Sequence, residues 1–146
     1  MIEAANFLPY LPGTWHVDRQ IHVRGRADSK FQGLAHIRPT DMRGTFSYHE
    51  EGRFVGEDVK IESYRDYLYK VKGGILTILF ADTHRMGEHY VTLDFSGGVT
   101  AEDTYLCDDD IYGHIFEIIN GDHFSTETAV SGPEKDYRLI THYRRL

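Results

Sequence analysis

The sequence has 146 residues, of which 40% are hydrophobic, and a formal net charge of −7. This is the size of one globular domain, spanning residues 1–146, and the acidity disfavours nucleic-acid binding because phosphate backbones repel an acidic chain. No window approaches the ~18 apolar residues of a membrane span, the N-terminus lacks the features of a signal peptide, and the lone Cys107 cannot form an internal disulfide, so we expect a cytoplasmic protein that does not bind membranes.

The predicted elements are one short helix followed by a succession of strands. Only the first dozen residues could form a helix, which Pro9 and Pro12 would end. Period-two alternation, interrupted by turn signals, predicts strands over 14–24, 31–38, 44–55, 57–72, 74–82, 88–95, 99–107, 111–119, 123–131 and 136–145. Short turns pair each strand with its sequence neighbour, and closure removes the exposed edges. We therefore expect an all-β fold, a closed antiparallel up-and-down β-barrel of about eight to ten strands.

The first and last predicted strands indicate how one end of this barrel is closed. Gly13-Thr14-Trp15 begins the first strand, and Arg145 ends the last one. In a closed barrel these two strands are neighbours, so the guanidinium can cover the indole ring. We expect Trp15 and Arg145 to form the floor of a barrel that is open at its other end.

Strand alternation also places charged side chains on faces that are otherwise apolar. Arg19 shares a face with Trp15 and Val17, and three further faces carry Phe46, Tyr48 and Glu50; Arg65, Tyr67 and Tyr69; and Ile78, Phe80 and Asp82. Buried charges are costly unless they are paired or contact a ligand. Two interpretations stay open. Either Arg19 and Arg65 neutralise Glu50 and Asp82, or these groups line a polar, aromatic pocket that orients a ligand.

Segments spread over the whole chain resemble one family. The Gly-x-Trp start and the basic last strand resemble the calycin (lipocalin-like) superfamily. More narrowly, residues 11–15, 46–52, 65–69, 80–82, 107–112, 130–137 and 141–145 resemble the family called domain of unknown function 6314. The resemblance implies a lipocalin-like barrel but no reaction. The chain departs from the expected pattern at Tyr105, in place of His, and at Thr128, in place of Trp, which argues against carrying over an activity that uses that His.

The histidines and the cysteine offer little support for a metal or a nucleophile. His114 and His123 flank a hairpin and could approach each other, yet no carboxylate or thiolate is spaced to complete a site. We therefore expect no metal. No nucleotide-binding motif is present either, so we expect no cofactor. Haem held by one interior His is an alternative, with His89 as first choice. Three aspartates follow Cys107 and disfavour its thiolate, so we do not expect it to be a nucleophile.

The leading hypothesis is a barrel that binds one small organic molecule, aromatic or anionic. The residues expected to bind it are Arg19, Tyr48, Glu50, Arg65, Tyr67, Tyr69, Asp82, His89, Tyr112 and Tyr137. The two arginines would meet a carboxylate or enolate, and the tyrosines would pack and hydrogen-bond.

The competing hypothesis is a cofactor-independent enzyme of the isomerase, cyclase, dehydratase or decarboxylase type. Glu50 or Asp82 would be the general acid or base, and Arg65 would stabilise negative charge. A third class is a protein-interaction module that uses exposed tyrosines and acidic faces. The oligomeric state is left open, and a homodimer is compatible with the sequence.

Overall fold

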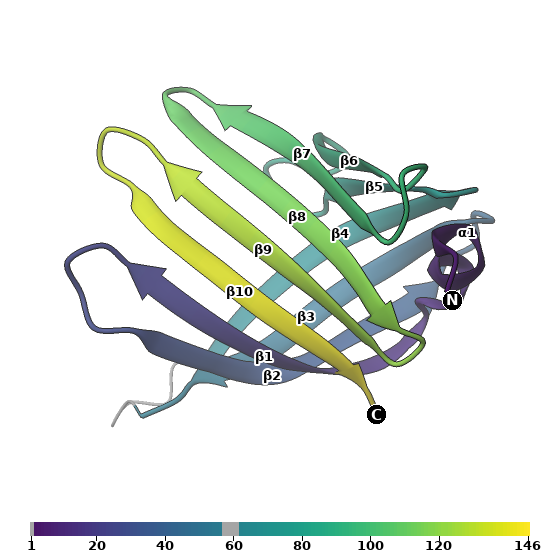
Figure 1. The fold of residues 1–146 in the computed structure, drawn as a ribbon, viewed down its shortest axis with the longest axis horizontal. Coiled ribbons are helices and arrows are strands. Elements are labelled where there is room, and N and C mark those ends of the chain that lie inside the picture. Colours follow the sequence, from purple (N-terminus) through teal and green to yellow (C-terminus); the bar gives the residue numbers. More distant parts are fainter. Residues whose placement is uncertain (1, 57–61) are drawn as a thin grey trace.

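The computed structural model describes residues 2–56 and 62–146 as one antiparallel barrel (Figure 1). A short helix α1 (Ala4–Phe7) and a 3-10 turn η1 (Leu8–Tyr10) precede the strands. The strands are β1 (Gly13–Val23), β2 (Ser29–Pro39), β3 (Thr45–Phe54), β4 (Glu62–Lys72), β5 (Ile75–Phe80), β6 (His89–Asp94), β7 (Thr100–Cys107), β8 (Asp110–Asn120), β9 (His123–Ser131) and β10 (Asp136–Arg145). The predicted all-β class is confirmed. Residues 57–61 of the predicted fourth strand lie outside the described residues.

The strands pair in the order β6-β5-β4-β3-β2-β1-β10-β9-β8-β7, so the first and last strands are neighbours as expected. Their antiparallel register runs from Trp15 opposite Arg145 to Val23 opposite Tyr137. Within the described residues the ladder does not continue from β6 to β7. At that seam the Asp103 Oδ2 atom accepts the backbone N–H of Thr92 at 2.8 Å. The barrel is therefore nearly closed, and a side chain bridges the gap that the backbone leaves.

Aromatic side chains fill the end of the barrel that α1 covers. Phe124 is fully buried at the centre of this floor. Its ring stacks on Phe116 and on Tyr143, with centroids 4.8 and 4.4 Å apart, and meets the edge of Trp15 at 4.8 Å. Phe7 of α1 adds an edge contact at 6.2 Å. Burying this much aromatic surface is a main source of stability, and it leaves the space further along the barrel axis free.

Arg145 closes the floor from outside. Its guanidinium carbon lies 4.2 Å from the centre of the Trp15 ring, and the guanidinium donates hydrogen bonds to the carbonyls of Pro12 and Tyr10 at 3.1 and 2.9 Å. Gly13 makes room for it, since a Cβ there would lie 2.8 Å from an Arg145 nitrogen, and the φ of +148° at Gly13 disfavours other residues. Gly13, Trp15 and Arg145 therefore pack together to close the floor of the barrel.

Neither helical segment in the described part of the chain has the length and apolar character that crossing a bilayer requires.

Candidate functional site

A cavity of about 400 Å³ occupies the barrel beyond the aromatic floor. This is within the usual size range of small-molecule sites. Every tyrosine of the sequence except Tyr10 lines it: Tyr48, Tyr64, Tyr67, Tyr69, Tyr90, Tyr105, Tyr112, Tyr137 and Tyr143. The cavity opens at the end remote from α1, because Tyr137 pairs with the far end of β1 and Arg65 lies near the start of β4.

The tyrosine and phenylalanine rings form a continuous aromatic wall. Tyr48 stacks on Tyr69 at 5.1 Å, and Tyr67 stacks on Tyr90 at 6.1 Å. Phe80 extends the Tyr90 side, with centroids 5.0 Å apart. Burial raises the pKa of Tyr48 and Tyr69 well above the ordinary value, so their hydroxyls stay protonated. The wall therefore offers flat apolar faces and neutral hydroxyl groups.

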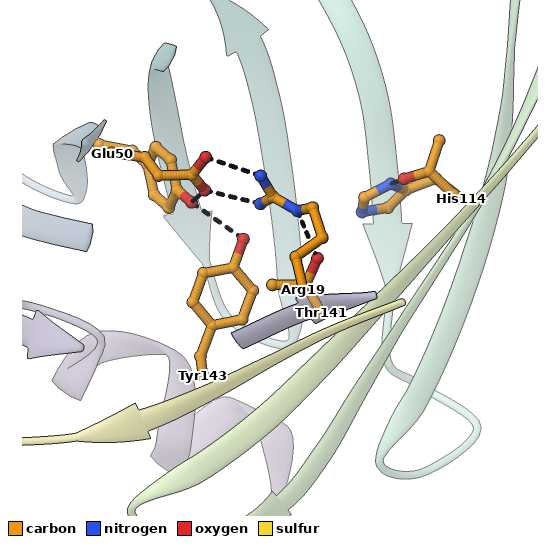
Figure 2. A network of polar contacts seen from close by, with 7 residues as sticks. Arg19, Glu50, His114, Thr141 and Tyr143 are labelled. Carbon is orange, nitrogen blue, oxygen red and sulfur yellow. Dashed lines mark hydrogen bonds and ion pairs between the residues drawn. The ribbon is translucent and has the colours of Figure 1, made fainter. Parts of the chain in front are cut away.

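Arg19 and Glu50 form a closed ionic network at the inner end of the cavity (Figure 2). Their side chains are joined by two hydrogen bonds, Nη1 to Oε2 at 2.8 Å and Nη2 to Oε1 at 2.7 Å. Arg19 Nε donates to Thr141 at 2.8 Å, and the Tyr48 hydroxyl donates to Glu50 Oε1 at 2.6 Å. Tyr48 also shares a 2.9 Å hydrogen bond with Tyr143. The network satisfies both charges internally.

This pairing fixes the protonation state of Glu50. Burial alone would favour its neutral form, but the hydrogen bonds and charge of Arg19 prevail and hold the Glu50 pKa below its ordinary value. The carboxylate is 1% exposed and Arg19 is 6% exposed. Glu50 is thus a buried carboxylate that is ionised at neutral pH and paired with Arg19, which is a poor starting state for a general acid.

Among the described residues, Arg65 and Arg85 line the outer part of the cavity, and Lys135 contacts the lining residue Tyr112. Lys135 contacts the Asp110 carboxylate at 3.1 Å and donates to the Tyr112 hydroxyl at 3.0 Å. Arg85 is held by Asp82. Arg65 is exposed, lines the cavity and makes no hydrogen bond or ion pair with any described residue. Its charge still reaches inward, where it helps to lower the Glu50 pKa.

Asp82 holds Arg85 and the turn after β5 in place at the mouth of the cavity. Its carboxylate accepts two hydrogen bonds from Arg85, at 3.0 and 2.7 Å, and the backbone N–H groups of His84 and Arg85. The Arg85 hydrogen bond lowers the Asp82 pKa. The same guanidinium lies 3.9 Å from the centre of the Phe80 ring. Asp82 is therefore neutralised by a near neighbour in sequence, and the interpretation that paired it with Arg19 or Arg65 was wrong.

His89 does not line the cavity, contrary to the prediction. It is exposed at the start of β6, where its Nε2 contacts the Thr92 hydroxyl at 2.8 Å. The β5–β6 register shifts between Ile78 and Leu79, and this bulge lets Tyr90 and Val91 both face inward. Strict alternation with Val91 would have placed His89 inside. The haem hypothesis based on His89 fails for the same reason.

The structure gathers the remaining predicted residues around one cavity. Its lining includes Arg19, Tyr48, Glu50, Arg65, Tyr67, Tyr69, Asp82, Tyr112 and Tyr137. Further lining residues were not predicted, and among them are Tyr90, Tyr105, His114 and Tyr143. Alternation could have found His114 and Tyr143, because His114 shares a face with Tyr112 and Tyr143 shares a face with Tyr137. Tyr90 gave no such signal because of the bulge.

His114 is a buried polar residue of the cavity wall, and one of its two ring nitrogens lacks a partner among the described residues. It is 7% exposed, and its Nδ1 atom lies 3.1 Å from the Thr128 hydroxyl. Its Nε2 atom is buried and has no hydrogen-bond partner, the one side-chain atom of this kind in the described residues. Burial lowers the His114 pKa to about 4, so the imidazole is neutral at physiological pH.

No group of three or more His, Cys, Asp or Glu side chains within residues 2–56 and 62–146 is placed to hold a metal ion. His114 and His123 do not approach each other, because His114 pairs with Thr128 inside the barrel whereas His123 contacts His142 at 2.8 Å on the outside. Cys107 is a free, half-buried cysteine on the cavity wall.

Comparisons with known proteins agree with this architecture. A family model described as "Family of unknown function (DUF6314)" matches residues 11–145. Comparison with curated proteins found no match. Among solved structures, the chain is similar to the S-type phycobiliprotein lyase CPES from Guillardia theta, with a TM-score of 0.70 and 11% identity over 99% of this chain and 93% of that chain.

Two further barrels are similar at lower scores. EF1p2_mFAP2b, solved bound to DFHBI, has a TM-score of 0.54 and 14% identity over 98% of this chain and 99% of that chain. Rv2717c from M. tuberculosis has a TM-score of 0.56 and 10% identity over 100% of this chain and 99% of that chain. At such identities the likeness concerns the fold alone.

Proposed function

The chain belongs to the DUF6314 family of unknown function, and we propose that it binds one small aromatic anion inside its barrel. The observation that carries the proposal is an aromatic cavity of about 400 Å³ whose mouth holds a cation, Arg65, without a partner among the described residues. Aromatic walls favour flat apolar ligands, and a guanidinium favours carboxylate or enolate oxygens.

The distribution of the other charges supports an anion at the mouth rather than deep inside. Arg19 is fully used by Glu50 and Thr141, so a second buried anion would have no free counter-charge there. Lys135 and Arg85 are paired with Asp110 and Asp82. Among the described arginines that line the cavity, Arg65 therefore remains as the one with which a ligand can pair at little desolvation cost.

Similar barrels support the general idea that this fold accommodates small molecules, since EF1p2_mFAP2b was solved with DFHBI bound. The phycobiliprotein lyase among the neighbours raises the question of catalysis. We do not extend the proposal to catalysis, because arginines hold both carboxylates on which acid–base chemistry would depend, Glu50 and Asp82.

The test measures binding of a panel of aromatic acids, including 2-naphthoate and cinnamate, by thermal shift and by isothermal titration calorimetry. A ligand that binds the folded state alone raises its stability in proportion to RT ln(1 + [L]/Kd). We expect Arg65→Gln to weaken binding by about tenfold or more, and the outward-facing Arg38→Gln to leave it unchanged. The proposal fails if no aromatic acid stabilises the protein, or if both variants bind equally well.

A further inference from the structure

His114 lines the proposed binding cavity, and its buried Nε2 atom has no hydrogen-bond partner among the described residues. The imidazole projects from β8 into the barrel interior, and no hydrogen bond joins it to the network of Arg19 and Glu50 among the residues drawn in Figure 2. Its ring meets the edge of Tyr90, with centroids 5.6 Å apart. A buried polar atom without a partner costs about 1–3 kcal/mol, so a ligand group that reaches it gains an advantage.

The contact between Nδ1 and Thr128 fixes the orientation of the ring, and the Nε2 atom has no partner among the described residues in either tautomer. A threonine hydroxyl can accept from Nδ1–H or donate to a bare Nδ1. In the first case Nε2 is an acceptor, and in the second it is a donor. A hydroxyl group on the ligand complements both, because it can donate or accept.

We infer that His114 Nε2 is the interior hydrogen-bonding site for a hydroxyl group of the ligand. This inference rests on the proposed function and narrows its ligand class to hydroxylated aromatic acids. The His114 imidazole carries no charge at neutral pH, so it favours a neutral hydroxyl over a second anion. The ligand then enters with its hydroxylated ring first and leaves its anionic group at Arg65.

The experiment compares matched pairs of acids that differ by one hydroxyl: 4-hydroxycinnamate with cinnamate, and 6-hydroxy-2-naphthoate with 2-naphthoate. We expect the wild type to bind the hydroxylated member about tenfold more tightly, because a buried polar group is left unpaired by the analogue. His114→Leu should abolish this preference. His114→Gln, whose amide can still bond a hydroxyl, should retain part of it, and the surface variant His16→Leu should retain all of it.

A spectroscopic measurement separates a direct contact from a packing effect. In protein labelled with ¹⁵N-histidine, the Nε2 resonance of His114 should shift when the hydroxylated acid binds and change far less with its partner acid. If both members of each pair bind equally and the resonance shifts equally, the inference is overturned while the proposed function stands. If neither member binds, both are overturned. Loss of all binding in His114→Leu, including that of cinnamate and 2-naphthoate, also contradicts the inference.

Discussion

Arg19 and Glu50 face each other across the inside of the barrel and are joined by two hydrogen bonds of 2.8 and 2.7 Å. They come from different strands, β1 and β3, with β2 between them. The pair therefore crosslinks the barrel interior, and it decides between the two interpretations left open by the sequence for these two residues. They neutralise each other, whereas Arg65 remains at the mouth.

Breaking this pair should cost more than removing it. We expect Arg19→Met alone to destabilise the fold by about 3–5 kcal/mol, because Glu50 is left as a buried, uncompensated carboxylate. Arg19→Met combined with Glu50→Leu should recover most of that loss. Urea unfolding of Arg19→Met, Glu50→Leu and the double variant measures the coupling energy between the two residues. If the double variant loses as much unfolding free energy as Arg19→Met, this prediction is contradicted.

The acid stability of the protein should depend on His114. Its pKa is about 4 in the fold against an ordinary 6.5, as a result of burial. The unfolded chain therefore binds a proton at higher pH, and stability that is present above pH 6.5 is lost as the pH falls towards 4. Between pH 7 and pH 5 this loss amounts to about 2 kcal/mol.

The variant His114→Gln removes this titration, so its stability should fall correspondingly less over the same pH interval. Glu50, whose pKa is lowered, contributes to stability above its ordinary value of 4.5 and loses that contribution only below it. The interval from pH 7 to pH 5 therefore separates the two groups. Identical pH profiles for the wild type and His114→Gln in chemical denaturation would refute this account.

The floor should be sensitive to Arg145 and insensitive to the residue before it. Arg145→Leu removes the contact with the Trp15 ring and the hydrogen bonds to the Pro12 and Tyr10 carbonyls. We expect a loss of about 2 kcal/mol in unfolding free energy. Arg144→Leu, on the opposite face of β10, is the matched control. Trp15 is the sole tryptophan of the sequence, so its fluorescence reports the floor directly.

The seam between β6 and β7 should loosen when Asp103 is replaced. The Thr92 N–H loses its acceptor in Asp103→Ala, so its hydrogen exchange should accelerate markedly, by at least about tenfold. Amides in the β1–β10 ladder should keep their protection. Glu102→Ala, an exposed neighbour on β7, serves as the control, and unchanged exchange at Thr92 in Asp103→Ala would count against this role.

Alternation along the strands predicted the barrel and much of its lining, because side-chain direction in a regular strand depends on position alone. Arg19, Glu50 and Tyr48 lie inside for this reason. The same rule failed at β6, where a bulge moves Tyr90 inward and His89 outward. A bulge depends on the register of two strands, which a single sequence does not display.

The partners of charged residues were harder to predict than their positions. Asp82 pairs with Arg85, three residues ahead in the turn after β5, because a tight turn brings its side chain back onto the carboxylate. The sequence predicts two arginines and two carboxylates on interior faces: Arg19, Arg65, Glu50 and Asp82. Which of them form pairs depends on distances across the barrel, which the sequence does not give. The near closure at β6 and β7 also lies beyond pattern analysis, since it depends on the lengths of two short neighbouring strands.

The two ends of the described chain lie on the same side of the molecule (Figure 1). Helix α1 covers the floor, and β10 finishes there with Arg145 over Trp15. A purification tag, a reporter domain or a surface linker attached to either terminus would therefore lie at the floor of the barrel, away from the mouth of the cavity. A barrel immobilised through a group attached at either terminus would keep the mouth of its cavity facing the solution.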